Sequence, residues 1–151
     1  MNDLDTSSRE LLTFKLGKQE YALDIMSVRE IRGWTKTTPM PHSPAFMRGV
    51  INLRGTVLPV MDLAARLGLP PIETTERNVI IVVKSGEGMT GLLVDAVSDI
   101  IALSEDDMQP PPDVGSESSG NTISALSLME DRMVRILALD NVIAKMETVA
   151  A

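Results

Sequence analysis

Cysteine is absent from this chain of 151 residues, and histidine occurs only once, as His42. Without thiols the chain has no disulfide, no thiolate zinc site and no cysteine nucleophile, and one histidine cannot build a multi-histidine metal centre. Aromatic residues make up 3% of the sequence, too few for a surface that stacks nucleic-acid bases. No apolar run reaches the ~18 residues that a membrane-spanning helix needs. These absences favour a soluble domain, which we expect in the cytoplasm.

Basic residues are in the minority as well. The 14 lysines and arginines are outnumbered by 21 aspartates and glutamates, so the formal net charge is −7. A protein that binds a phosphate backbone needs a basic face, and this balance therefore argues against nucleic-acid binding. The first five residues are polar and acidic, which is unlike a signal peptide. The length suffices for a buried core in one domain or in two small ones.

Apolar residues fall into short runs separated by turn residues, a pattern typical of β-barrels and β-sandwiches. The run 79–83 consists of five β-branched residues, which is typical of a strand buried on both faces. The segments predicted to be strands are 12–16, 21–23, 46–53, 57–61, 79–83, 89–97, 100–103, 123–129 and 133–139. Together they predict a mainly β protein.

Three short helices are predicted between or after these strands. The first begins after Asp24 and ends near Gly33, with Ile25, Val28 and Ile31 at three-residue steps as its apolar edge. In a helix, residues at this spacing lie on one side.

Asp62 and Asp140 are predicted to cap the second and third helices, the third being C-terminal. Residues 1–9 carry no apolar period and are predicted to be a tail. Residues 104–122 are acidic and then rich in proline, serine and glycine, so they are predicted to form the longest loop. The prolines at 70–71 are predicted to mark the seam between two β units.

Three motifs suggest chemistry but are better explained by structure. Residues 86–91 match the GxGxxG pattern of dinucleotide-binding folds, but too little chain follows for βαβ units, so a glycine-rich hairpin is predicted. The acidic run 105–107 lacks the alternate spacing and glycine of a calcium loop and is predicted to be a solvated loop. His42 and Ser43 have no acid to complete a relay. We therefore predict no enzyme and no catalytic, cofactor-binding or metal-binding residues.

Glu30 and Arg54 are charged residues of a different kind. Arg54 lies between two apolar runs and precedes Gly55, which allows a tight reversal, so we expect it near the tip of a hairpin. Glu30 would lie on the exposed side of the first predicted helix, together with Arg29 and Arg32. The spacing does not say whether Glu30 and Arg54 touch, and two solvated charges are the alternative.

Taken together, the segments resemble the CheW-like domain family of chemotaxis adaptors. The resemblance covers roughly residues 10–146, and its most specific part is PAFMRGVINLRG at 44–55. NLRG alone is a weak motif, but the ordered set of segments is specific. The other segments that carry the resemblance are 12–17, 20–25, VREIRG at 28–33, VLPVMDL at 57–63, GLLVDAV at 91–97 and DRMV at 131–134.

The resemblance implies a fold of two SH3-like, five-stranded β-barrel subdomains side by side, with short helices that include one at the C-terminus. We expect a single CheW-like domain at 10–148. Its first barrel would span approximately 17–70 and its second 76–140, with edge strands and the terminal helix shared between them.

The resemblance also implies a function. Members of the family are non-catalytic adaptors that couple the cytoplasmic tips of chemoreceptors to the histidine kinase CheA. They bind the regulatory domain of the kinase, itself CheW-like, and a helical hairpin of the receptor. The alternative is a CheW-like module in another chemosensory pathway, such as surface motility or gene regulation.

By the same resemblance, Val28, Glu30, Gly49 and Arg54 stand at partner-binding positions, and an ion pair between Glu30 and Arg54 is favoured. The implied protein has no cofactor, binds no nucleic acid and does not insert into the membrane. It would be a monomer in isolation and would be recruited to membrane-associated receptor–kinase arrays.

Three residues depart from the pattern of the family. Ala125 stands where many members have glycine, Leu128 stands where lysine is common, and Arg135 stands where an apolar residue is usual. We expect these departures to affect the surface of the second barrel rather than the fold.

Overall fold

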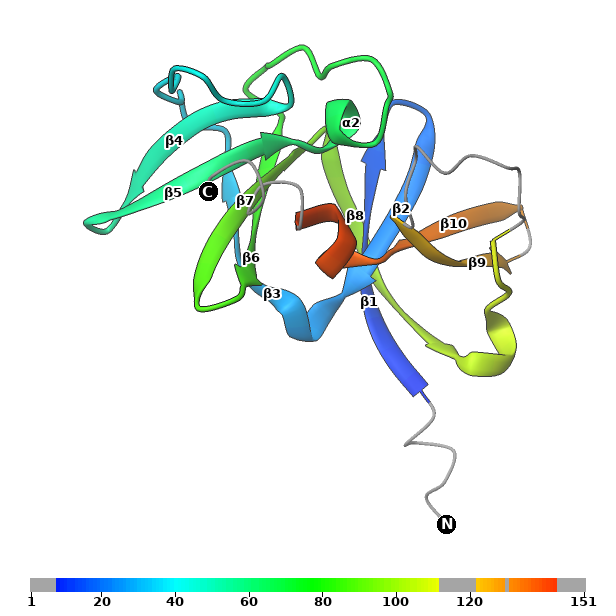
Figure 1. Ribbon diagram of the computed structural model, residues 1–151. Coiled ribbons are helices and arrows are strands. Elements are labelled where there is room, and N and C mark those ends of the chain that lie inside the picture. Colours follow the sequence, from blue (N-terminus) through cyan, green and yellow to red (C-terminus); the bar gives the residue numbers. More distant parts are fainter. Residues whose placement is uncertain (1–7, 112–121, 130, 144–151) are drawn as a thin grey trace.

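The structure is a computed structural model that describes residues 8–111, 122–129 and 131–143. Within these ranges, strands form two five-stranded sheets that lie side by side (Figure 1). Sheet 1 contains, in spatial order, β8 (Ala96–Ser104), β1 (Ser8–Leu16), β2 (Gln19–Asp24), β10 (Arg132–Leu137) and β9 (Ile123–Met129). Sheet 2 contains β3 (Val28–Gly33), β6 (Val79–Ser85), β7 (Gly88–Val94), β5 (Thr56–Asp62) and β4 (Met47–Leu53). The prediction of a mainly β protein with two five-stranded units is confirmed.

The two sheets divide the chain differently from the predicted barrels at 17–70 and 76–140. Sheet 2 is built from the continuous stretch 28–94, whereas sheet 1 joins the first strands of the chain to its last ones. The prolines at 70–71 therefore lie inside the stretch that forms sheet 2. The physical reason is that β1 pairs with β8 and β2 pairs with β10 across long stretches of chain, which local turn signals do not reveal.

Strand β1 is buried on both faces, and this joins the two sheets. Leu12, Phe14 and Leu16 point to one side and belong to a large apolar core that includes residues of sheet 2. Leu11 points to the other side and belongs to a small core within sheet 1. Sheet 1 thus fills its own interior with one face of β1 and packs against sheet 2 with the other. We call the large cluster the shared core.

The shared core also contains residues of β6 and of the C-terminal helical segment. Residues 80–83 of β6 are fully buried, as the β-branched run predicted. Val142 and Ile143 are buried in the same core and belong to the helical residues 139–143. Figure 1 shows this segment between the two sheets.

The prediction of a helix between Asp24 and Gly33 is wrong for most of that stretch. Asp24 caps only one 3-10 turn, η1 (Ile25–Ser27), where its carboxylate accepts a hydrogen bond from the Met26 N–H at 2.9 Å. From Val28 onward the chain is strand β3, which pairs with β6. The helix ends at once because the following residues form a sheet ladder instead of helical hydrogen bonds.

A bulge in β3 explains why this sequence looks helical. Val28 lies opposite Val83, Ile31 lies opposite Ile81, and the register shifts between these two pairs. Because Val83 and Ile81 are two residues apart in a strand, they point to the same face. Val28 and Ile31 therefore share that face although they are three residues apart. The bulge produces the three-residue step that is otherwise typical of a helix.

Two of the other short turns are capped by aspartate. Asp62 caps α2 (Leu63–Arg66) as predicted, because its carboxylate accepts a hydrogen bond from the Ala65 N–H at 3.0 Å. The acidic run forms the 3-10 turn η2 (Glu105–Asp107). In this turn the Asp107 carboxylate accepts a hydrogen bond from the Ser104 N–H at 2.9 Å. A bond to the local backbone thus accounts for Asp107, one of the three acidic residues of the run 105–107.

The C-terminal helical segment begins at Leu139, before the predicted cap Asp140. The Ala138 carbonyl accepts a helical hydrogen bond from the Val142 N–H at 3.1 Å. Ala138 therefore occupies the capping position, and the prediction that Asp140 caps this helix is wrong.

The segments predicted to be irregular are partly regular. The predicted tail 1–9 is too long, because Ser8 and Arg9 belong to β1 and pair with β8. Its first seven residues lie outside the described ranges. The predicted loop 104–122 contains η2, and residues 112–121 lie outside the described ranges. No helix within the described ranges is long and apolar enough to cross a membrane.

The glycine-rich segment 86–91 forms a hairpin between β6 and β7, as predicted. Gly86 has a φ of 60° and lies in the turn. Gly91 is buried, and an added Cβ there would lie 2.8 Å from Ile80 Cγ2. Turn geometry and close packing therefore account for both glycines.

The shared core predicts that the two sheets unfold together. Phe14→Ala removes a fully buried ring of sheet 1 and should lower the free energy of unfolding by about 3–5 kcal/mol. Trp34, the only tryptophan, follows β3 and packs against the shared core, so its fluorescence reports on sheet 2. In a urea titration of the variant, Trp34 fluorescence and circular dichroism should both shift to lower urea.

Leu128→Ala is the matched control. Leu128 also lies in sheet 1 but is 59% exposed, so its removal should change stability by no more than about 0.5 kcal/mol. If the Trp34 transition of Phe14→Ala stays at the wild-type midpoint, the sheets have separate cores.

Candidate partner-binding site

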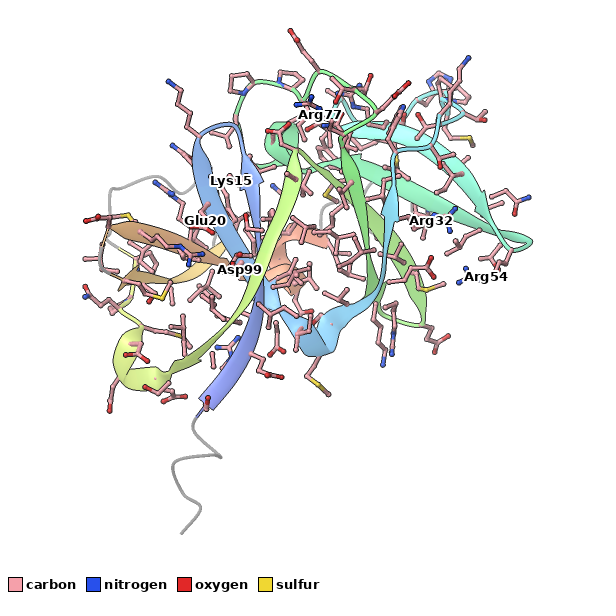
Figure 2. All side chains as sticks on the ribbon, turned by 180° about the vertical axis from the view of Figure 1, so that it is seen from behind. Lys15, Glu20, Arg32, Arg54, Arg77 and Asp99 are labelled. Atoms are coloured by element: carbon pink, nitrogen blue, oxygen red, sulfur yellow. The ribbon has the colours of Figure 1, made fainter. Side chains whose placement is uncertain are left out.

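Arg54 lies at the tip of the β4–β5 hairpin, as predicted. Arg54 and Gly55 form the turn with φ values of 52° and 88°, the two positive values that a type I′ turn requires. The Gly55 N–H also donates a hydrogen bond to Asn52 Oδ1 at 2.8 Å, which closes the turn. The Arg54 side chain is 68% exposed, and Figure 2 shows it at the outer end of the hairpin.

Glu30 and Arg54 form an ion pair. Arg54 Nη2 lies 2.7 Å from Glu30 Oε1. Glu30 belongs to β3 and Arg54 follows β4, and these strands are the two opposite edges of sheet 2. A side-chain contact thus links two edge strands that are not neighbours in the sheet.

A second arginine, Arg32, binds the same carboxylate. Its Nη1 lies 3.2 Å from Glu30 Oε2. Glu30 and Arg32 stand opposite Val82 and Ile80 of β6, both fully buried, so this face of β3 covers apolar residues. The Arg32 and Glu30 side chains are 30% and 29% exposed. The prediction that they lie on the exposed side of a helix is therefore wrong.

The two arginines favour the ionised form of Glu30. The hydrogen bond from Arg54 is the main cause that lowers the pKa of the Glu30 carboxyl, and the hydrogen bond from Arg32 adds to it. Glu30 in turn raises the pKa of the Arg54 guanidinium. Because water surrounds Arg54, the pair contributes little to stability. Its main effect is to fix the shape and charge of this surface.

Val28 and Ile31 form an apolar edge on the other face of β3. Val28 is half-buried and packs against the shared core, as Ile25 does in η1. Ile31 is 46% exposed. The predicted apolar edge therefore exists, but a bulged strand builds it, and its exposed end lies next to Glu30 in the chain.

Gly49 has a packing role that the sequence did not reveal. It is buried and has a φ of 136°. An added Cβ would overlap the Thr38 carbonyl oxygen and lie 2.7 Å from the Thr38 carbonyl carbon. Thr38 pairs with Val50 through two backbone hydrogen bonds of 2.9 Å each. Gly49 therefore allows Thr38, at the start of the proline-rich segment 38–44, to lie against the outer edge of β4.

A buried carboxylate holds the base of the same hairpin. Asp62 is 2% exposed, and its Oδ2 accepts hydrogen bonds from Arg48 Nη2 at 2.8 Å and from the Ile72 N–H at 3.0 Å. Arg48 also donates to the Ile72 carbonyl oxygen. The sequence identified Asp62 only as a helix cap, and nothing in the local pattern pointed to Arg48. These bonds tie β4, β5 and the segment after α2 together.

A second charged cluster lies in sheet 1, where Figure 2 shows Glu20 and Asp99 far from Arg54. Arg132 donates hydrogen bonds of 3.0 and 2.5 Å to the Glu20 carboxylate and lies 3.3 Å from Asp99 Oδ1. The parallel pairing of β10 with β2 spans only residues 134–136, so this bidentate pair supports a short ladder. Among the described residues, no group of three or more histidine, aspartate or glutamate side chains is placed to hold a metal ion.

Comparison with known proteins identifies the family. The model of the CheW-like domain matches residues 10–147. The chain belongs to the CheW-like domain family. The chemotaxis protein CheW of Rhizobium meliloti is 49% identical over 148 residues, covering 98% of this chain and 96% of the relative. The probable chemotaxis protein CheW of Rhizobium etli is 47% identical over 151 residues, covering 100% and 97%.

A solved structure of the CheW-like family has the same fold. The crystal structure of the scaffolding protein TtCheW from Thermoanaerobacter tengcongensis superposes with a TM-score of 0.81. It is 32% identical in sequence, and the match covers 89% of this chain and 91% of that one. The resemblance that the sequence carries is therefore confirmed, together with the predicted fold class.

The lowered pKa of Glu30 predicts that its pair with Arg54 loses its effect in acid. Such a carboxyl stabilises the fold above its pKa in the unfolded chain, near 4.5, and this contribution disappears as the pH falls through the folded value. The difference in melting midpoint between wild type and Arg54→Ala should therefore be larger near pH 7 than near pH 3. Lys84→Ala, which removes an exposed lysine of β6, corrects for the general loss of a positive charge. A difference that is equal at both pH values after this correction would contradict the prediction.

Gly49→Ala is expected to destabilise the CheW-like fold by about 1–3 kcal/mol, because the new Cβ strains the backbone and displaces Thr38. Gly33→Ala is the control, since an added Cβ at that position meets nothing within 4 Å. Thermal unfolding of both variants measures the difference. Equal melting midpoints for the two variants would show that β4 does not need a glycine here.

Proposed function

We propose that this chain is a non-catalytic chemotaxis adaptor that couples the cytoplasmic tips of chemoreceptors to the histidine kinase CheA. The family is common to this role and to a module of another chemosensory pathway, and the chemotaxis names of its relatives support this role over the alternative. On this proposal, residues 10–148 act as one cytoplasmic unit that is a monomer in isolation. The unit joins receptor–kinase arrays by binding the regulatory domain of the kinase and the receptor tip.

The observation that carries the proposal is the exposed guanidinium of Arg54. Its Nη2 is bonded to Glu30, while 68% of the side chain remains exposed at the end of a hairpin. A guanidinium has five N–H donors, so Arg54 retains donors for a partner. A carboxylate or a carbonyl of the receptor can accept them in a geometry that lysine would not reproduce.

The apolar edge of β3 supplies the second element of the proposed docking surface. A helical partner binds through apolar anchors flanked by polar groups. Val28 and Ile31 share one face, and Ile31 is 46% exposed. Glu30 lies between them in the chain, on the other face of the same edge strand, and holds Arg54, so a partner at the free edge of β3 can reach both groups. We propose Val28 and Ile31 as the anchors and the Glu30–Arg54 pair as the polar flank.

Gly49 has an indirect part in this proposal. It allows Thr38 to pair with Val50 of β4, which supports the hairpin that carries Arg54. A larger residue at Gly49 would displace this segment and thereby disturb partner binding without removing any contact to the partner.

Arg54→Ala should abolish most of the receptor-dependent activation of the kinase and leave the fold intact. Loss of one exposed ion pair should shift the melting midpoint by no more than about 4 °C. Loss of an arginine anchor at an interface weakens binding by roughly thirtyfold or more. The measurement is a kinase assay with purified chain, CheA and receptor, next to a thermal melt of each variant.

Arg77→Ala is the matched control for this assay. Arg77 is also an exposed arginine of this chain, and Figure 2 shows it at a different end of the molecule from Arg54. Normal activation with Arg54→Ala would show that the hairpin tip is not the coupling surface. Unfolding of Arg54→Ala would assign Arg54 a structural role.

A further inference from the structure

The Glu30 carboxylate is shared by two arginines that hold it unequally. Arg54 binds Oε1 at 2.7 Å from the tip of a hairpin, and Arg32 binds Oε2 at 3.2 Å from the same strand as Glu30. An arginine binds a carboxylate most strongly through two parallel hydrogen bonds. Each arginine here donates only one hydrogen bond to Glu30, so both retain donors for a second bond.

Arg32 has an unused donor within the protein. Its Nε–H is buried and has no hydrogen-bond partner among the described residues. A buried donor without an acceptor is unfavourable, and a guanidinium held by one bond is free to turn towards a second acceptor. Because Arg32 is only 30% exposed and belongs to β3 itself, it stays beside Glu30 whatever binds the surface.

Arg54 differs from Arg32 in each of these respects. It is 68% exposed and lies in a two-residue turn beyond the end of β4. Its guanidinium can therefore leave Glu30 with little change in packing. Without Arg32, this movement would leave the half-buried carboxylate of Glu30 without a positive partner, which is unfavourable.

We propose that Arg32 is a positioning residue that takes over Glu30 when Arg54 turns to a carboxylate of the receptor. This inference rests on the proposed function, in which Arg54 contacts the receptor. The cluster contains two arginines and one glutamate, so it carries one excess positive charge in a chain of net charge −7. A carboxylate is the partner group that neutralises this excess, and Arg32 keeps Glu30 paired in both states.

The experiment measures binding of a purified receptor cytoplasmic fragment to the full chain by calorimetry. Arg32→Gln should weaken binding roughly fivefold, because Arg54 must then leave an otherwise unpaired carboxylate. In a Glu30→Gln background the same substitution should change binding by less than about twofold, since no carboxylate remains to be compensated. This difference between backgrounds is the effect that a merely structural role would not produce.

Two further variants complete the set. Arg77→Gln is the matched control, because Arg77 is an exposed arginine that lies outside both the cluster and the proposed docking surface, and its binding should equal that of the wild type. Arg32→Lys keeps a positive charge beside Glu30 and should bind within about twofold of the wild type. Arg32→Gln should melt within about 4 °C of the wild type.

Several results would overturn the inference. One is that Arg32→Gln binds the receptor fragment as the wild type does, and another is that Arg32→Gln weakens binding equally in the wild-type and Glu30→Gln backgrounds. A third is a fall in its melting midpoint of more than about 4 °C, which would mark Arg32 as a structural residue. An equal loss in both backgrounds would mean that Arg32 contacts the receptor itself. Failure of the proposed function would look different, because Arg54→Ala would then bind the fragment as the wild type does.

Discussion

The apolar layer between the two sheets is the constraint on which the rest of the structure depends. Strand β1 is buried on both faces, with Phe14 in the shared core and Leu11 in the small core of sheet 1. Strand β2 packs with it and leads through η1 directly into β3. The packing that fixes β2 therefore also fixes where β3 begins, and with it the positions of Val28 and Glu30. In this way an interior constraint sets the position of a carboxylate at the surface.

The β4–β5 hairpin fixes the other half of the site. Asp62 and Arg48 hold its base, Gly49 admits a neighbouring segment along its outer edge, and the turn at 54–55 directs the guanidinium of Arg54 outward. The scaffold is stabilised by buried hydrogen bonds and packing, whereas the Glu30–Arg54 pair at its tip is surrounded by water and contributes little to folding. On the proposal made above, this separation would allow Arg54 to change partners while the fold is unaffected. It also suits an adaptor, whose surface side chains must adjust to a partner while its scaffold stays rigid.

Sequence patterns predicted the parts of this structure that depend on neighbouring residues. Gly55 after Arg54 predicted the hairpin tip, and the β-branched run at 79–83 predicted a strand buried on both faces. The same patterns failed where distant segments decide. The bulge in β3 places Val28 and Ile31 on one face and so imitates a helix, and only pairing with β6 reveals the strand. The predicted boundary between the two β units differs from the division between the sheets, because β2 pairs with β10 from the far end of the chain. Residue spacing left the contact of Glu30 with Arg54 open, and only the family resemblance favoured it. The contact joins the two opposite edge strands of sheet 2, and the spacing of residues within either strand carries no information about it.

Nuclear magnetic resonance of the isotope-labelled chain can locate the receptor-docking surface, which we propose is formed by β3 and the tip of the β4–β5 hairpin. The measurement is a titration with a receptor cytoplasmic fragment, followed through backbone amide signals and the guanidinium signal of Arg54. We expect the signals of residues 28–33 and 52–56 and of the Arg54 guanidinium to shift first. Signals of β9 and β10, including that of the exposed Leu128, should stay in place. Shifts confined to β9 and β10, with an unperturbed Arg54, would place the receptor on sheet 1 instead.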